Sequence, residues 1–281
     1  MANQLKLKPF IKWVGGKRDV IKKYLRFYLP KSYGNYYEVF AGGAAMLYQL
    51  QPNCAVINDI NEDLIITYQV IKNQCHQLME KLDEHQGLHS LNYYYQMRQL
   101  ISEDKIARAA RFIYLNKTCY NGLWRVNKNN QFNVPPNRKE AVVLYERDNL
   151  IKLSKWFRTH KIKFTNESFD KWFKKYDQKI NSGDFIFIDP PYDYEVGHGG
   201  FVAYSQSGFN QNQQRELAHY LKKLDQRGVL WMHTNHDTAL IRELYRDFTI
   251  IECLTNRAVN RDGTNRKNSG REVIIINYLV D

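Results

Sequence analysis

The stretch Phe185-Ile186-Phe187-Ile188-Asp189-Pro190-Pro191-Tyr192 decides the fold of this 281-residue chain. Its four leading apolar residues predict a short strand that is buried on both faces, as in a parallel sheet covered by helices. Two successive prolines cannot continue a strand or begin an ordinary helix, so they predict a stiff turn directly after it. Ligands bind at the carboxyl ends of strands in open α/β sheets. The sequence therefore places a candidate site at this turn.

Strand and helix patterns alternate on both sides of this stretch, which favours a mostly parallel sheet covered by helices. Further strands are predicted at residues 36–40, 55–58, 162–165 and 228–233 and nearer the C-terminus, and helices at residues 17–29, from 44 and up to 157. Helical patterns dominate residues 62–147, including 105–116. We therefore predict an α/β domain made of residues 1–61 and 148–281, interrupted by a mainly helical insertion at 62–147.

The turn after the apolar strand offers two hydrogen-bond acceptors, the Asp189 carboxylate and the Pro190 carbonyl. The amine of adenine is a poor nucleophile because its lone pair is delocalised into the ring. Two acceptors that bind its N–H groups would bring the nitrogen toward tetrahedral geometry and direct the lone pair at a methyl donor. Tyr192 would stack on the base. An ordinary strand-to-loop turn is the alternative interpretation.

A second pattern, Glu38-Val39-Phe40-Ala41-Gly42-Gly43-Ala44-Ala45, passes from a strand through two glycines into a helix. Small residues allow a ligand to approach the backbone, and a helix N-terminus offers unpaired N–H groups. Asp59 follows the next strand, about twenty positions further on, where a carboxylate can accept hydrogen bonds from ribose hydroxyls. Together these features indicate a nucleoside-bearing cofactor, although any tight turn into a helix could carry the glycines.

Residues 120–136 predict a β-hairpin that exposes aromatic, Asn and Arg side chains at its ends. Such a hairpin is suited to reading base edges in a groove and to insertion into a base stack. A solvated hairpin that packs on the sheet explains the same spacing.

The chain carries 41 Lys and Arg against 29 Asp and Glu, a formal net charge of +12. This excess favours a polyanionic partner, because clustered cations gain affinity by releasing the counterions of nucleic acid. A soluble basic protein without such a partner would show the same charge.

Cysteine spacing and hydropathy exclude several classes. The four cysteines are scattered and form no C-x-x-C pair, which disfavours disulfides and a zinc site. His233 and His236 could suggest a metal, but structural or DNA-proximal histidines explain them better, and we expect no metal. No apolar run is long enough to cross a bilayer, and residues 1–12 lack a signal-peptide pattern. From these two hydropathy observations, we expect a cytoplasmic protein with no membrane partner.

With these residues in hand, the chain resembles the DNA adenine-N6 methyltransferases of the Dam type, the α group. In that family the cofactor motif, the recognition region and the Asp-Pro-Pro-Tyr motif occur in this order. The resemblance covers nearly the whole chain and is carried by residues 12–17, 40–44 with Asp59, 115–123, 132–135, 167–169 and 189–192. It implies a Rossmann-like methyltransferase sheet, with residues 62–147 as the target-recognition domain and the hairpin 120–136 within it.

The resemblance also implies roles for individual residues, S-adenosylmethionine as cofactor and double-stranded DNA as partner. The catalytic turn would consist of Asp189, Pro190, Pro191 and Tyr192. The cofactor-binding residues would be Trp13, Lys17, Phe40, Ala41, Gly42, Gly43, Asp59, Ser168, Phe169 and Asp189. The DNA-binding residues would be Lys12, Tyr120, Asn121, Leu123, Arg125, Asn133 and Pro135.

Among the DNA-binding residues, Lys12, Leu123, Arg125 and Pro135 match positions that read bases in GATC-specific relatives. Tyr120 and Asn121 match the pair that fills the space left by an extruded base, since leaving the duplex costs stacking and pairing. The resemblance therefore favours a GATC site, and a bacterial or phage enzyme with or without a cognate restriction endonuclease. The oligomeric state stays open.

Alternative functions share part of this pattern. A cytosine-N4 methyltransferase would use the same amine activation, although such enzymes usually begin the tetrapeptide with Ser or Thr. Methyltransferases for RNA or for protein glutamine often carry Asn at that position. A non-catalytic DNA-binding protein of the same fold is the alternative from a different class, and Asp189, Tyr192, Asp59 and Gly43 argue against it.

Overall fold

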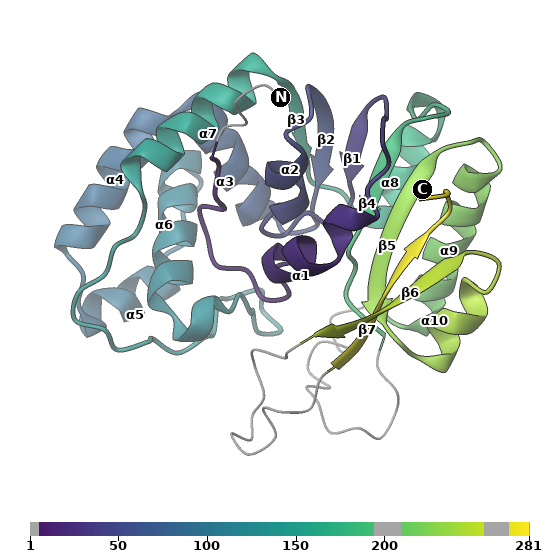
Figure 1. Ribbon diagram of the computed structural model, residues 1–281. Helices are drawn as coiled ribbons and strands as arrows, with labels where there is room; N and C mark the ends of the chain where they lie inside the picture. The colour runs from purple at the N-terminus through teal and green to yellow at the C-terminus, as the bar shows by residue number, and fades with distance from the viewer. Residues whose placement is uncertain (1–5, 194–208, 256–269, 281) are drawn as a thin grey trace. The chain divides into compact units, whose positions relative to one another are not determined.

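The computed structural model describes residues 6–193, 209–255 and 270–280. Packing divides the chain into two compact units: unit 1 contains Met1–Lys17 and Ala41–Glu167, and unit 2 contains Arg18–Phe40 and Ser168–Asp281. Among the described residues, seven strands follow the order β3-β2-β1-β4-β5-β7-β6 (Figure 1). The predicted α/β class is confirmed.

Unit 1 holds most of the helices. Its strands are β2 (Cys54–Asn58) and β3 (Lys161–Thr165), and its helices are α2 (Ala45–Leu50), α3 (Glu62–Asn73), α4 (Cys75–Gly87), α5 (Leu91–Gln99), α6 (Lys105–Thr118), the 3-10 turn η2 (Tyr120–Gly122) and α7 (Arg147–Thr159). Strands β2 and β3 pair in parallel. Helix α6 packs against α3, α4 and α5 (Figure 1). Helices α3, α4, α5 and α6 all lie within residues 62–147, where the sequence predicts mainly helical structure.

The helices of unit 1 begin at polar residues that accept backbone hydrogen bonds. The Asn61 side chain accepts from the Leu64 N–H at the start of α3, and the Asp104 side chain accepts from the Ala107 N–H at the start of α6. These bonds satisfy donors that a helix N-terminus leaves unpaired. The apolar face of α6 is fully buried at Phe112 and Leu115.

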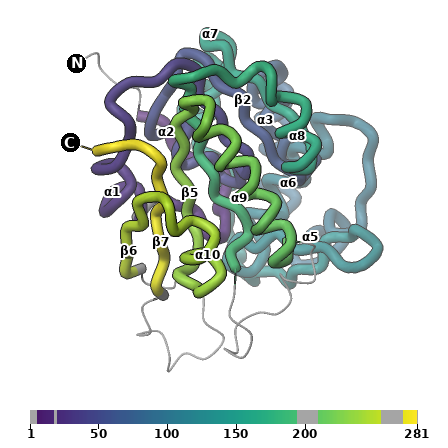
Figure 2. The backbone as a smooth tube through the Cα atoms, turned by 90° about the vertical axis from the view of Figure 1, so that its right-hand side faces the viewer, coloured from purple at the N-terminus to yellow at the C-terminus, as the bar shows by residue number. Residues whose placement is uncertain are grey.

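Unit 2 contains the apolar strand at residues 185–188 and the turn that follows it. Its elements are α1 (Arg18–Lys23), the 3-10 turn η1 (Leu25–Phe27), β1 (Tyr36–Glu38), α8 (Phe169–Tyr176), the 3-10 turn η3 (Asp177–Lys179), β4 (Phe185–Ile188), α9 (Gln211–Asp225), β5 (Leu230–His236), α10 (Ala239–Leu244), β6 (Thr249–Thr255) and β7 (Gly270–Ile276). Strand β4 pairs in parallel with β1 and β5, and all four of its residues are buried. Strand β7 pairs antiparallel with β5 and β6. Figure 2 shows α9 running along β5, on which it packs.

Two element boundaries differ from the sequence-based expectation by three residues or more. The helix predicted for residues 17–29 ends at Lys23 and continues as the turn η1, in a stretch rich in aromatic residues, which favour helix less than alanine does. Strand β5 continues to His236 rather than ending at residue 233, because Thr234 and Asn235 find buried hydrogen-bond partners. None of the helices in the described ranges has the length and apolarity that a membrane span requires.

Candidate functional site

The turn after β4 starts from a carboxylate that a neighbouring strand holds in place. Asp189 is half-buried, and its Oδ1 accepts a hydrogen bond of 2.6 Å from the Thr234 hydroxyl on β5. Pro190 is buried, and no described residue outside the turn donates a hydrogen bond to its carbonyl. Parallel pairing of β4 and β5 places Thr234 beside the end of β4. The Asp189 carboxylate and the Pro190 carbonyl therefore follow each other directly at the end of β4.

Tyr192 lies half-buried against charged and aromatic neighbours. Its hydroxyl donates to Glu272 Oε2 at 3.4 Å, and its ring meets the His236 ring edge-on at 4.8 Å between centroids. Burial, followed by the negative charges of Asp189 and Glu272, raises the pKa of the Tyr192 phenol well above its usual value. The phenol therefore remains neutral and keeps its proton at physiological pH.

The two histidines of β5, His233 and His236, each contact a backbone carbonyl. His233 is fully buried, its Nδ1 lies 3.3 Å from the Ile188 carbonyl, and burial lowers its pKa to about 3. His236 Nδ1 lies 2.8 Å from the Asp193 carbonyl. No group of three metal-ligating side chains occurs among the residues that the structure describes.

Three aromatic rings gather in unit 2 around the start of α8. Phe40 and Phe169 lie 5.9 Å apart between ring centroids, and Phe209 lies 5.6 Å from the first and 5.3 Å from the second. The Ser168 side chain bonds the Asp170 carboxylate and lowers its pKa. Phe40, Ser168 and Phe169 are predicted cofactor residues, so the structure brings three of them together and adds Phe209.

The glycine turn in unit 1 is closed by Asp59. Asp59 Oδ2 accepts from the Gly42 N–H at 2.8 Å, and Oδ1 accepts from the Asn61 N–H at 2.9 Å. Burial raises the pKa of Asp59, and these two bonds partly oppose the shift. The carboxylate is therefore fixed by the backbone on both sides.

Trp13 explains why the turn carries glycine. A Cβ atom on Gly42 would lie 2.5 Å from the Trp13 indole nitrogen, and Gly42 also has a φ of +47°. A Cβ on Gly43 would lie 3.1 Å from the Trp13 Cβ. The nearby Lys17 is buried and donates to the Gly15 carbonyl at 2.9 Å. The predicted residues Trp13, Gly42, Gly43 and Asp59 therefore form one cluster.

The hairpin in unit 1 is anchored at its base by Trp124. The centroid of the Trp124 ring lies 4.2 Å from that of Phe112 on α6 and 4.8 Å from that of Phe132. The centroid of the Phe112 ring also lies 6.3 Å from that of Trp13. The chain reverses with an antiparallel bridge between Val126 and Phe132. The hairpin is thus present, with isolated bridges in place of two regular strands.

Six of the seven predicted DNA-binding residues belong to the hairpin 120–136, and the seventh, Lys12, belongs to the N-terminal segment. Tyr120, Asn121 and Pro135 are exposed and Leu123 is half-buried. The Arg125 Nε donates to Asn133 Oδ1 at 2.8 Å, which joins two of the predicted residues.

Asn116 ties the N-terminal segment to the start of the hairpin. Its Oδ1 accepts from the Lys12 N–H at 3.0 Å, and its Nδ2 donates to the carbonyls of Lys12 at 2.7 Å and Gly122 at 3.1 Å. Asn116 is fully buried on α6. Asn116 therefore holds Lys12 beside the start of the hairpin.

Comparison with known proteins identifies the chain. The family model for the D12 class N6 adenine-specific DNA methyltransferase matches residues 13–259. The chain belongs to this family.

Relatives of the methyltransferase cover almost its whole length. It is 34% identical to the type II methyltransferase M1.LlaDCHI of Lactococcus lactis subsp. cremoris, over 98% of this chain and 97% of the relative. It is 35% identical to the type II methyltransferase M.MjaIII of Methanocaldococcus jannaschii, over 98% and 100%. It is 29% identical to the DNA adenine methylase of Escherichia coli K12, over 93% and 92%. The predicted resemblance and the enzymatic activity are confirmed, and the cytosine-N4 and non-catalytic alternatives are set aside.

Several residues that contact the predicted site of the methyltransferase were not found from the sequence. They are Thr234, which bonds Asp189, Phe209, which joins the aromatic rings, and Gln214 and Asn235, which hold the turn. The one available signal is the polar pair Thr234-Asn235 directly after the strand that the sequence predicts at residues 228–233. The remaining contacts join residues far apart in the sequence.

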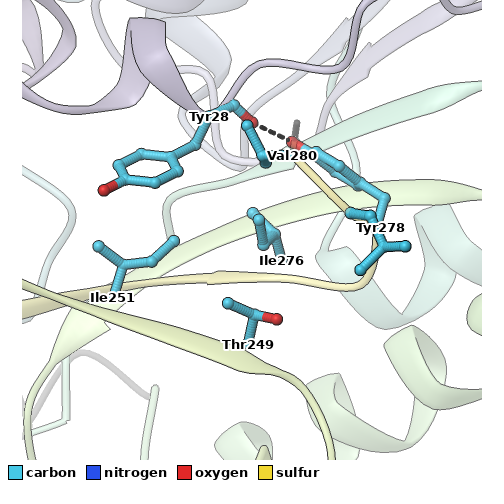
Figure 3. Close-up of a pocket in the computed structure, with 7 residues that line it drawn as sticks. Tyr28, Thr249, Ile251, Ile276, Tyr278 and Val280 are labelled. Atoms are coloured by element: carbon cyan, nitrogen blue, oxygen red, sulfur yellow. Dashed lines mark hydrogen bonds between the residues drawn. The ribbon is translucent and has the colours of Figure 1, made fainter.

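Unit 2 of the methyltransferase also has a cavity of about 210 Å³, which lies apart from the predicted site residues (Figure 3). It is lined by Tyr28, Thr249, Ile251, Ile276, Tyr278, Leu279 and Val280. The Tyr278 hydroxyl donates to the Tyr28 carbonyl at 2.8 Å (Figure 3). The lining carries no Asp, Glu, His, Lys or Arg side chain.

Proposed function

We propose that this enzyme transfers the methyl group of S-adenosylmethionine to N6 of an adenine extruded from a GATC site in duplex DNA. One observation carries the proposal: the Asp-Pro-Pro-Tyr turn stands at the carboxyl end of β4, with the Asp189 carboxylate held by Thr234 at 2.6 Å. Substrates bind at this end of the strands in open α/β sheets.

Asp189 and Pro190 supply the acceptors for the two N–H groups of the amine. Their hydrogen bonds localise the nitrogen lone pair and direct it away from the ring. As the new N–C bond forms, the bond between the methyl carbon and the donor sulfur would break, which would leave a neutral thioether. The nitrogen would then carry a positive charge, which the Asp189 carboxylate would stabilise until the extra proton passes to solvent. Tyr192 stacks on the extruded base, and its neutral phenol keeps a negative charge away from the base.

The residues present are compatible with S-adenosylmethionine, which supplies an electrophilic methyl group when it is bound. The Asp59 carboxylate accepts the Gly42 and Asn61 N–H groups through different oxygens. A carboxylate has about four lone-pair sites, so acceptor capacity remains for the hydroxyls of a ribose. The rings of Phe40, Phe169 and Phe209 offer faces on which an adenine can stack. We assign Trp13, Lys17, residues 41–43 and Ser168 to the same task.

The hairpin and its neighbours support a role in DNA recognition. We assign residues 62–147 to the target-recognition domain and residues 1–61 and 148–281 to the catalytic domain, of which 1–5, 194–208, 256–269 and 281 lie outside the described residues. Asn133 orients the Arg125 guanidinium, which then reads a guanine edge. Lys12, Leu123 and Pro135 read the other bases, and Tyr120 with Asn121 fills the emptied position in the stack.

The cellular setting follows from the names of the relatives. Type II methyltransferases and a DNA adenine methylase are among them, so we propose a bacterial or phage enzyme that works in the cytoplasm, with or without a cognate restriction endonuclease as a partner.

Sequencing of modified bases tests this function. DNA from a methylation-null host that expresses the chain should carry N6-methyladenine at GATC and at no other tetranucleotide. In vitro, purified enzyme should transfer label from S-adenosylmethionine to a GATC duplex. Modified adenine at a different site would overturn the GATC assignment alone, whereas unmodified DNA would overturn the proposed function.

A further inference from the structure

Both flanks of Tyr192 are held by hydrogen bonds from elements outside the turn. Gln214 Nε2 on α9 donates to the Pro191 carbonyl at 3.0 Å, and the Asp193 N–H donates to Asn235 Oδ1 on β5 at 2.9 Å. Pro191 and Asp193 directly precede and follow Tyr192. The backbone on either side of the proposed stacking residue is therefore fixed.

The two side-chain amides also bond each other. Asn235 Nδ2 donates to Gln214 Oε1 at 3.1 Å. The bonds thus run in one direction, from the Asp193 N–H through Asn235 and Gln214 to the Pro191 carbonyl. They form a closed ring of hydrogen bonds around the Tyr192 backbone, which we call the amide ring.

The amide ring is buried and its orientation is determined. Gln214 is 1% exposed and Asn235 is 0% exposed. Asn235 Oδ1 also accepts from the His236 N–H at 2.8 Å, so two backbone donors require its oxygen to face the turn. A buried amide that lost its partner would cost stability, so each bond in such a network restrains the next.

Two further contacts restrain the end of the turn. The Thr238 hydroxyl donates to Asp193 Oδ2 at 2.6 Å, and the His236 ring contacts the Asp193 carbonyl at 2.8 Å. These contacts act on Asp193 alone. Within the amide ring, Gln214 is the residue that hydrogen-bonds to a proline of the turn, through the Pro191 carbonyl.

We propose that Gln214 and Asn235 are positioning residues for methyl transfer, which hold the Pro191–Asp193 backbone so that Tyr192 and the acceptors of the turn face the extruded adenine together. This inference rests on the proposed function of the turn. It assigns to α9, which carries none of the predicted site residues, the task of setting the geometry of the reacting groups.

The decisive substitution is Gln214→Glu. A glutamate at this position keeps one oxygen that accepts from Asn235. When it is ionised, its second oxygen replaces the amide donor and faces the Pro191 carbonyl, which is also an acceptor. The two oxygens repel each other, and we expect the turn to be displaced. A protonated glutamate donates to that carbonyl and restores the bond. Because burial raises the pKa of a carboxyl group above its ordinary value, we expect the new glutamate to become protonated within the pH range of the assay. The matched control is Gln226→Glu, which adds the same charge at an exposed position just after α9.

Single-turnover methylation of a GATC duplex is measured from about pH 8.5 to about pH 6, for the two variants and wild type. At the upper pH, Gln214→Glu should be slower than wild type by about tenfold, the cost of one lost buried bond. The ratio of variant to wild type should rise as the pH falls. The titratable neighbours His233, His236, Asp189, Asp193 and Glu272 are present in both proteins, so their effects cancel in this ratio. Affinity for the duplex and for S-adenosylmethionine should match Gln226→Glu.

A Gln214→Glu rate equal to that of the control, or a ratio that stays flat with pH, would overturn the positioning role. If this variant does not fold, Gln214→Met removes the donor without adding charge. It should also be slower by about tenfold with unchanged DNA affinity, and a wild-type rate would overturn the inference. Failure of the proposed function looks different, because wild type itself would then leave adenine unmethylated or Asp189→Ala would stay active.

Discussion

At the scale of single residues, the chemistry depends on where two oxygen atoms of the turn are held. The Asp189 carboxylate is the one acceptor there that a substitution can remove, since the other is the backbone carbonyl of Pro190. Asp189→Ala should lower the rate of methyl transfer by about 10²- to 10³-fold or more, because the amine then stays planar. Transfer of tritium from labelled S-adenosylmethionine measures the rate. DNA affinity should persist, and an Asp189→Ala enzyme with wild-type activity would refute the mechanism.

Thr234 controls the direction of that carboxylate through one hydroxyl. Thr234→Val keeps the shape of the side chain but removes the 2.6 Å bond to Asp189. We expect the single-turnover rate to fall by about tenfold, with little change in affinity for the cofactor. Thr234→Ser retains the hydroxyl and should recover most of the rate. Equal losses in both variants would show that packing at β5, and not the hydrogen bond, is responsible.

At the scale of elements, the hairpin is a scaffold that aims a few side chains. The Arg125 Nε donates to Asn133 Oδ1 at 2.8 Å, which restrains the guanidinium. A bidentate contact from a guanidinium to guanine is worth about 1–3 kcal/mol of discrimination against another base. Arg125→Ala should therefore relax specificity at one base pair more than it slows methylation of the best site. A panel of duplexes that carries every single substitution in GATC tests this. Uniform slowing across the panel would mean that Arg125 contacts only phosphate.

The sequence predicted those elements whose signals are local. Strand β4 and its turn follow from four apolar residues and two prolines, and the position of the glycine turn follows from its spacing to Asp59. The remainder depends on contacts between distant segments. Thr234 bonds a residue 45 positions away, and Gln214 one 23 positions away, so no periodic pattern marks them. The end of β5 was predicted too early because a buried polar pair looks like a loop until its partners are known.

At the scale of the whole molecule, the net charge of +12 governs encounter with DNA. Neutralising phosphates with Lys and Arg releases counterions, so the logarithm of affinity should fall linearly with the logarithm of salt concentration. Anisotropy titrations of a labelled duplex between about 50 mM and 200 mM salt should show a steep loss, of the order of 10³-fold if about six phosphates are contacted. An affinity that hardly changes over this range would exclude a mainly electrostatic interface.

Stability should depend on pH through two buried histidines. Burial lowers the pKa of His85 to about 4 and that of His233 to about 3, against 6.5 in an unfolded chain. Below pH 6.5 these two histidines take up protons in the unfolded chain but not in the folded protein. Lowering the pH therefore decreases the free energy of unfolding, until the pH reaches the folded-state pKa of each histidine. Each histidine contributes about 1.4 kcal/mol per pH unit in this window. Urea denaturation at several pH values should show a smaller slope for His85→Gln, and an unchanged slope would contradict the buried neutral state.

The aromatic contacts of unit 1 give the enzyme two optical reporters. Trp156, Trp172 and Trp231 are at most 1% exposed, whereas Trp13 and Trp124 are only half-buried. One of these two indoles rests on the glycine turn and the other supports the hairpin, with Phe112 in contact with both. Emission that responds to solvent should therefore come from the two proposed binding regions and not from the interior. Two variants would separate these signals: one with Trp124 replaced by phenylalanine, which keeps Trp13 at the glycine turn, and one with Trp13 replaced, which keeps Trp124 at the hairpin. Their intrinsic fluorescence would time the binding of cofactor and of DNA separately, without any attached dye.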